Sequence, residues 1–227
     1  MPADRLLTTA LLAEVALRIA PPGAVAARHT AAVLWGGVVP DTAQVHLTLK
    51  PGTRLRVDGI DARVRHRVQM GRHHGLPLTS PGQTFHDLAE DLDLVDLVVV
   101  GDSLVRSGLV SRANLERAAT QLSGPGTKGA GGAVAYVRPG VDSAMESRLR
   151  LLLVLAGLPE PIVNLPIRDE VTGRVLYRID LAYPQWRIAI GIRRSPARGV
   201  RPSVAMGRPA PRRAGTGRLA ARRRVVR

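Results

Sequence analysis

Cysteine is absent from the 227-residue chain, and so are long apolar runs. Without cysteine there is no disulfide bond, no thiolate metal ligand and no cysteine nucleophile, which fits a reducing cytosol. The longest uninterrupted apolar run near the C-terminal core is Leu151 to Leu158, well short of the roughly 20 residues that span a bilayer. The N-terminus lacks a basic region and Glu14 interrupts its apolar stretch, so no signal peptide is expected. We predict a cytoplasmic protein without membrane association.

Positive charge is abundant but unevenly distributed. The chain has 33 Lys and Arg against 18 Asp and Glu, a formal net charge of +15. Residues 191–227 contain 12 of the arginines and no acidic residue, so residues 1–190 keep 21 basic against 18 acidic residues, a net charge of +3. The excess is therefore one terminal block, and we expect residues 193–227 to be a disordered basic tail. Its candidate nucleic-acid contacts are Arg193, Arg194, Arg198 and Arg201.

Residues 1–123 have the pattern of a mixed α/β region. Apolar residues at helical spacing predict helices over residues 4–20, 30–35, 84–92 and 94–107, and a further helix capped by Ser111. Period-two alternation predicts a strand at 45–49 and weaker strands at 54–57 and 62–68. Ser80-Pro81-Gly82-Gln83 is a capping box with proline at the first helical position. The apolar stripe expected on the first helix is Leu7, Leu11, Val15 and Ile19.

Residues 124–135 are rich in glycine and predict a linker between two domains. Lys128 raises the alternative of a phosphate-binding loop. The Gly-Lys-Ser/Thr order of such loops is absent, however, and no clear strand leads into the segment. Three histidines, His66, His73 and His74, lie close in sequence without metal-ligand spacing and are expected on the surface.

Residues 136–192 predict one helix followed by three strands, so the whole chain belongs to the α/β (α+β) class. Ser143 and Glu146 stand at capping-box spacing, with the Glu146 carboxylate expected to fold back onto the N–H of Ser143. Residues 161–166 predict a short strand, and alternation over 175–181 and 186–192 predicts a hairpin turning at Pro184-Gln185.

A two-residue turn in this hairpin would place Asp180 opposite Ala189 and diagonal to Gly191. A side chain at position 191 would then share a ligand with Asp180. Trp186, like Trp35, is expected to be a core anchor.

The sequence contains, in this order, Ser143-x-x-Glu146, the helix, the strand with Asp180 and the strand from Trp186 to Ile190. This order resembles the Vsr-like endonuclease-domain family common in actinobacteria. That family is similar to the PD-(D/E)xK restriction-endonuclease-like fold. Upstream, His29 to Gly36 and Leu76 to Ala89 resemble the N-terminal region of AbiEi-type antitoxins. The resemblance covers about residues 5–190, and relatives usually carry a winged-helix-like segment before the position of Asp4.

The resemblance implies Mg²⁺-dependent hydrolysis of phosphodiester bonds by metal-bound carboxylates. Asp180 would be the central metal ligand and Glu146 a helix-borne acid at the edge of the site. The family's next ligand should be an acidic residue at position 191, but this chain has Gly191-Ile-Arg-Arg194. The sequence therefore predicts a remnant site with one metal-ligating carboxylate, and no cofactor is expected to bind.

A single-nucleotide insertion would explain this departure. The codons GAA TAC GAC GG encode Glu-Tyr-Asp-Gly, and one G placed before them gives GGA ATA CGA CGG, which encodes Gly-Ile-Arg-Arg. Arg, Ala, Gly and Pro supply 27 of the 37 residues from 191 to 227, as expected of GC-rich DNA read out of frame. We hypothesise that residues 191–227 are frameshifted. An alternative reading frame of the gene that encodes no acidic residue and no helix–strand pattern there would refute this.

Three functions follow from the sequence. The first is a degenerate, inactive DNA endonuclease, in which Asp180 and Glu146 are remnants. The second is an AbiEi-type antitoxin or transcriptional-regulator-like module that binds DNA, a toxin or another partner protein through residues 1–123. The third is non-specific nucleic-acid binding by the arginine-rich tail, which lacks the aromatic residues that stack on single strands.

Overall fold

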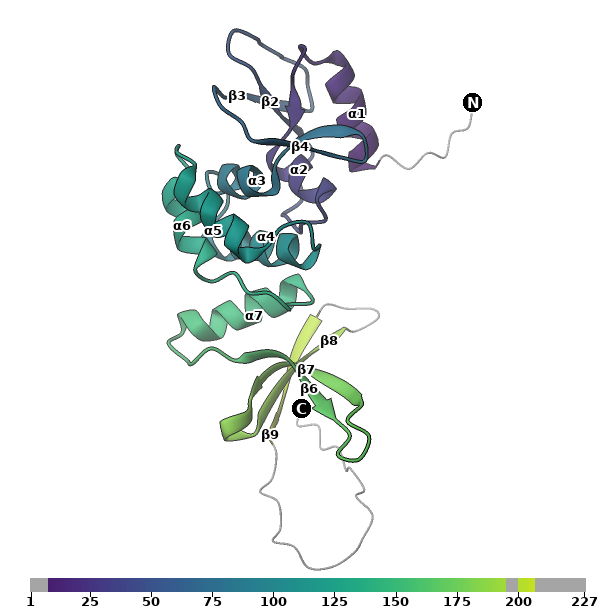
Figure 1. Ribbon diagram of the computed structural model, residues 1–227, viewed down its shortest axis with the longest axis vertical. Helices are drawn as coiled ribbons and strands as arrows, with labels where there is room; N and C mark the ends of the chain where they lie inside the picture. Colours follow the sequence, from purple (N-terminus) through teal and green to yellow (C-terminus); the bar gives the residue numbers. More distant parts are fainter. Residues whose placement is uncertain (1–7, 195–199, 207–227) are drawn as a thin grey trace, which may run out of the picture. The chain divides into compact units, whose positions relative to one another are not determined.

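The computed structural model describes residues 8–194 and 200–206 and confirms the α/β class (Figure 1). The chain divides into two units, residues 1–152 (unit 1) and residues 153–227 (unit 2). This division lies inside a helix rather than in the predicted linker at 124–135. None of the helices in the described part of the chain combines the length and apolar character that a membrane span requires.

Unit 1 contains a five-stranded mixed sheet. The strand order is β3-β2-β1-β5-β4, in which β1 and β5 are parallel, β2 and β3 are parallel, and the other neighbours are antiparallel. The strands are β1 (Val25–Ala26), β2 (Val45–Leu49), β3 (Ile60–Val64), β4 (Met70–His73) and β5 (Leu76–Thr79). Only β2 and part of β3 were predicted, because the other strands are too short or too polar for a clear period of two. The strand predicted at 54–57 does not form.

Helices make up the rest of unit 1. They are α1 (Thr9–Ile19), α2 (Arg28–Leu34), α3 (Pro81–Leu88), α4 (Leu94–Arg106), α5 (Arg112–Gln121), α6 (Thr127–Val134) and α7 (Ala144–Leu155), whose last residues pass into unit 2. The caps at Ser80 and Ser111 are confirmed, since each hydroxyl accepts the N–H three residues later. Trp35 is confirmed as a core anchor, because it is 6% exposed and its Nε1–H donates to the Thr79 carbonyl at 2.9 Å.

The first helix differs from its prediction. Thr8 caps it, so it begins at Thr9 instead of Asp4, and Asp4 and Leu7 lie outside the described residues. Ala13 and Ala16 are its buried residues, whereas Val15 and Ile19 are 52% and 54% exposed. Small side chains let a helix approach its neighbours closely, so the larger residues that set the predicted stripe are not the ones buried.

The predicted linker also differs, because residues 127–134 form α6. Ala130, Ala133 and Val134 are buried in the core of unit 1. A Cβ at Gly126 would lie 2.1 Å from the His86 carbonyl oxygen, and one at Gly129 would lie 3.0 Å from that of Ala89. These two glycines therefore serve close packing of α6 against the end of α3, and glycine content alone does not distinguish this role from a flexible linker.

Unit 2 contains a four-stranded antiparallel sheet of order β6-β7-β8-β9. Its elements are β6 (Ile162–Arg168), β7 (Val175–Tyr183), the 3₁₀ turn η1 (Pro184–Trp186), β8 (Ile188–Arg194) and β9 (Val200–Met206). The helix and three strands predicted for 136–192 are present as α7, β6, β7 and β8. The strand β9 corrects the expected disordered tail at residues 200–206, where apolar residues occur at every second position of the sequence.

The hairpin of β7 and β8 has a longer turn than predicted. Residues 184–186 form η1 and Arg187 takes a left-handed conformation with φ 54°, so Ala182 pairs with Ala189 and Leu181 with Ile190. Trp186 belongs to this turn and is 53% exposed, so the predicted anchor role is wrong. Leu181 is buried, but Tyr177 on the same face is 59% exposed. Alternation defines a face, and only other elements decide whether that face is covered.

Candidate functional site

Glu146 lies in the first turn of α7 and is 6% exposed. Its Oε1 accepts the Ser143 hydroxyl at 2.8 Å, its Oε2 accepts the Asp142 N–H at 3.0 Å, and its own N–H donates to Ser143 Oγ at 3.3 Å. This arrangement is a capping box in which the carboxylate binds the N–H of Asp142 in place of that of Ser143. Both carboxylate oxygens of Glu146 are therefore engaged in starting the helix.

Asp180 lies on β7 in unit 2 and is half-buried. The pairs Ala182 with Ala189 and Leu181 with Ile190, continued by one step, place Asp180 opposite Gly191 instead of opposite Ala189. The position that would need an acidic side chain is thus the direct neighbour of Asp180 across the ladder, and it has no side chain. Glu146 belongs to unit 1 and Asp180 to unit 2.

Three of the four predicted nucleic-acid contacts lie on strands. Arg193 and Arg194 end β8, and Arg201 on β9 is the ladder partner of Arg193. Arg198 lies outside the described residues. Within residues 8–194 and 200–206, no three His, Asp or Glu residues are grouped so that they could hold a metal ion.

A polar network that the sequence did not predict lies around Arg28 in unit 1. Arg28 is 2% exposed and begins α2 in a left-handed conformation with φ 46°. Its Nη1 lies 2.8 Å from Asp61 Oδ2 and 3.3 Å from Asp91 Oδ2, and its Nη2 donates to the Asp61 carbonyl at 3.1 Å. A buried guanidinium held by two carboxylates is a structural ion pair whose partners come from β3 and from the segment after α3.

The same network continues through Arg63 of β3 and through Arg65, the residue after β3. Arg63 reaches Asp91 at 2.8 Å and Glu90 at 3.3 Å, and Arg65 also pairs with Glu90. Hydrogen bonding to Arg28 lowers the pKa of Asp61. Burial acts to raise the pKa of Asp91, but hydrogen bonds and charges from Arg63 and Arg28 hold it below its usual range. Three cations and three anions thus neutralise one another.

Two histidines border this network. The rings of His29 and His46 stack with centroids 4.8 Å apart, and His46 Nε2 lies 3.9 Å from Asp61 Oδ2. Burial lowers the pKa of His29, and burial together with the charge of Arg28 lowers the pKa of His46 to about 4. His46 is therefore neutral at neutral pH.

The sequence signal that could have predicted this network is the alternation Asp61, Arg63, Arg65. It places three charges on one face of β3 and its continuation.

His46 makes the stability of unit 1 sensitive to pH. As the pH falls below 6.5 the unfolded chain binds a proton at this residue, whereas the folded chain does so only near pH 4. We expect the free energy of unfolding to be steady above pH 6.5 and to fall by up to about 3 kcal/mol between pH 6.5 and 4. Urea unfolding at several pH values measures this. His46→Gln should flatten most of the slope, and an unchanged slope would contradict the assignment.

A second buried ion pair fixes α7 onto α4. Asp102, which is 2% exposed, accepts the Arg138 N–H at 2.7 Å, the Ser147 hydroxyl at 2.7 Å and Arg150 Nη2 at 3.1 Å. Burial raises the pKa of Asp102, and these three donors oppose the rise. At the surface, Arg148 pairs with Asp96 at 2.7 Å. These contacts explain why α7 up to Leu152 belongs to unit 1.

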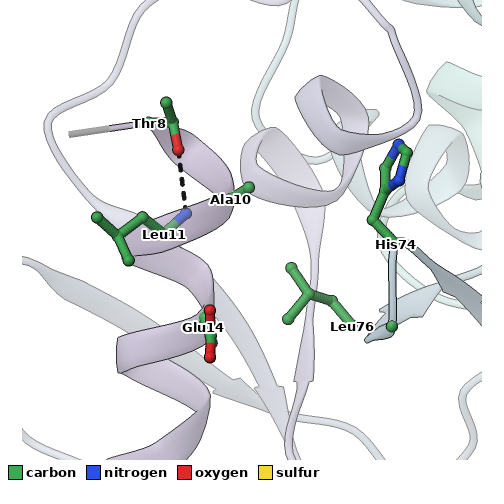
Figure 2. Close-up of a pocket in the computed structure, with 7 residues that line it drawn as sticks. Thr8, Ala10, Leu11, Glu14, His74 and Leu76 are labelled. Atoms are coloured by element: carbon green, nitrogen blue, oxygen red, sulfur yellow. Dashed lines mark hydrogen bonds between the residues drawn. The ribbon is translucent and has the colours of Figure 1, made fainter. Parts of the chain in front are cut away.

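Hollows on the described surface of unit 1 include the following two. The larger, of about 640 Å³, lies between α1 and the turn from β4 to β5, with Glu14 and His74 on opposite sides (Figure 2). Glu14 is already paired with Arg18 at 2.8 Å. The smaller, of about 410 Å³, is lined by β1, the end of β2 and residues 65–70, and includes the cations Lys50 and Arg65.

Comparisons with known proteins give uncharacterized relatives. No protein-family model matches the chain. The uncharacterized proteins Rv2248 and MT2308 of Mycobacterium tuberculosis, from strains H37Rv and CDC 1551, are each 32% identical over 168 residues, covering 73% of this chain and 61% of the relative. The chain thus spans less than two thirds of the length of these relatives.

Among solved structures, the crystal structure of the RV2827C protein from Mycobacterium tuberculosis aligns with a TM-score of 0.40 and 17% identity, over 70% of this chain and 61% of that one. This likeness is too low to define a shared fold.

Proposed function

We propose that the protein is a degenerate, catalytically inactive relative of the Vsr-like PD-(D/E)xK DNA endonucleases that retains a DNA-binding role. The register of β7 and β8, whose continuation places Asp180 opposite Gly191, is the observation that carries the loss of catalysis. Metal-dependent phosphodiester hydrolysis needs several oxygen ligands to hold one or two cations against the substrate. The residues here do not fit Mg²⁺, because the neighbour of Asp180 has no side chain and both oxygens of Glu146 bind the start of α7.

A plasmid assay tests the catalytic half of this proposal. Purified full-length protein incubated with supercoiled plasmid and Mg²⁺ or Mn²⁺ is expected to give no more nicked or linear DNA than Asp180→Ala does. The physical reason is that one carboxylate neither fixes the metal nor activates water. Robust cleavage that Asp180→Ala abolishes would show that the site is active after all.

The retained binding role is the second part of the proposal and corresponds to an AbiEi-type antitoxin or regulator. Unit 1 supports it, since this unit has its own apolar core and a neutralised polar network and contains neither Asp180 nor Gly191. DNA or a toxin partner would then be bound without the remnant site, in the cytoplasm. Asp180→Ala should bind DNA as the unmodified protein does, measured by fluorescence anisotropy.

The frameshift hypothesis supplies a cause for the lost ligand. An insertion at the codon of residue 191 would remove the acidic residue in one event and replace the rest of the family's domain by an arginine-rich sequence. The gene's nucleotides, read in the alternative frame, test this independently of any binding measurement.

A further inference from the structure

Residues 50–72 are strongly basic. This segment runs from the end of β2 through β3 to the start of β4. It contains Lys50 and six arginines but only two acidic residues, Asp58 and Asp61. The net charge of these 23 residues is +5, more than the +3 of residues 1–190 as a whole. Unit 1 therefore concentrates positive charge in this one segment.

Ion pairing leaves most of this charge unbalanced. Arg63 and Arg65 are neutralised by Glu90 and Asp91, and Asp61 is taken by the buried Arg28. The remaining cations are exposed and have no ion-pair partner among the described residues. Arg72 lies on β4, at the edge of the sheet opposite β3, and we call the other four the basic surface: Lys50, Arg54, Arg56 and Arg67. Asp58 is the single exposed acid within the segment. Of the two acids in the segment, Asp61 is thus turned into the network, whereas the excess cations are left in solvent.

Strand direction brings two parts of this segment together. Because β2 and β3 are parallel, Lys50 after β2 and Arg65 after β3 come to the same end of the sheet, where the Arg65 N–H donates to the Leu49 carbonyl at 3.1 Å. Both residues line the 410 Å³ hollow together with Thr48 and His66. Gly23, with φ 85°, makes room for the Lys50 side chain, since a Cβ there would lie 2.4 Å from Lys50 Cε. The hollow thus has cations and a hydroxyl at its wall.

The chemistry of this surface fits the phosphate groups of a polyanion. Exposed Lys and Arg side chains with no internal partner gain most from a polyanion, because binding releases the counterions of its phosphates. Residues 50–72 contain no Phe, Tyr or Trp, so they offer neither the stacking platforms of single-strand binders nor the aromatic anchors of membrane interfaces. We propose that the basic surface binds the phosphate backbone of duplex DNA, an inference that rests on the DNA-binding part of the proposed function.

Charge removal in the full-length protein tests this assignment. The triple variant Arg54→Gln/Arg56→Gln/Arg67→Gln is compared with a control of equal charge change on helices of the same unit, Arg106→Gln/Arg117→Gln/Lys128→Gln, where α4, α5 and α6 lie apart from β2 and β3 (Figure 1). Anisotropy of a labelled 30-base-pair duplex is titrated at several salt concentrations. We expect the first variant to bind about 10- to 100-fold more weakly and to lose about 2–3 from the salt slope, because each lost phosphate contact reduces it by about 1. The control should change little.

A third variant distinguishes binding by the C-terminal arginines from binding by the basic surface. In it, all eight arginines of residues 207–227 are replaced with glutamine. Loss of binding in this variant, with the Arg54/Arg56/Arg67 variant unaffected, would overturn the inference and assign binding to the tail. Absence of duplex binding by the unmodified protein would overturn the DNA-binding function itself. Binding to vesicles of anionic lipid in preference to DNA would overturn the choice of partner. Equal melting temperatures of all variants would confirm that folding is unchanged.

Discussion

Replacing Asp102 by alanine is expected to lower the free energy of unfolding of unit 1 by about 3–5 kcal/mol. Arg150 is fully buried and its Nη2 lies 3.1 Å from Asp102, so the substitution takes a carboxylate away from a cation that water cannot reach. The Arg138 N–H and the Ser147 hydroxyl lose their acceptor in the same step. Loss of one partner of a buried pair costs more than the pair itself contributes, because the remaining charge stays desolvated.

Urea unfolding followed by Trp35 fluorescence measures this effect. Trp186→Phe leaves Trp35 as the single tryptophan, and Trp35 is buried in the core of unit 1. The double variant Asp102→Ala/Arg150→Met should recover most of the lost stability, because the buried cation is removed together with its carboxylate. Glu116→Ala on the exposed face of α5 is the control and should change the free energy by less than about 0.5 kcal/mol. A loss below about 1 kcal/mol for Asp102→Ala would refute a charged, buried pair.

Replacing Arg28 by alanine is expected to cost a similar amount, about 3–5 kcal/mol, since Asp61 and Asp91 lose their buried cation. Arg28→Gly should be about 1 kcal/mol less damaging than Arg28→Ala, because φ is 46° at this residue and glycine takes that conformation without strain. The pKa of His46, held at about 4 partly by the charge of Arg28, should rise in both variants.

Urea unfolding gives the two free energies, and NMR titration of the His46 ring gives the pKa. Arg18→Ala is a suitable control, because its ion pair with Glu14 lies at the surface with the Arg18 side chain 76% exposed. An unchanged His46 pKa in Arg28→Ala would show that the two groups are not coupled. Equal stability of the glycine and alanine variants would argue against strain at residue 28.

Local chemistry was enough to predict the capped helices. Ser80 with Pro81, Ser111, and Ser143 with Glu146 each place a side-chain acceptor at a helix start, and these bonds form within four residues. The strand at Val45–Leu49 and the order of α7, β6, β7 and β8 followed from periodicity alone. The sequence by itself thus determined the α/β class and the place of most helices.

Contacts between distant residues decided the rest. The glycines of residues 124–135 serve a packed helix because Gly126 meets the carbonyl of His86, 40 positions earlier, which no local pattern shows. The hairpin turn consists of η1 and the left-handed residue Arg187, so Ala182 pairs with Ala189 and the continued register places Asp180 opposite Gly191 instead of opposite Ala189. Arg28, Asp61 and Asp91 are far apart in the chain and meet only through the sheet and the segment after α3. Sequence spacing therefore determined most of the helices, whereas burial and ion pairing, which depend on three-dimensional neighbours, decided which charges are neutralised and which remain exposed.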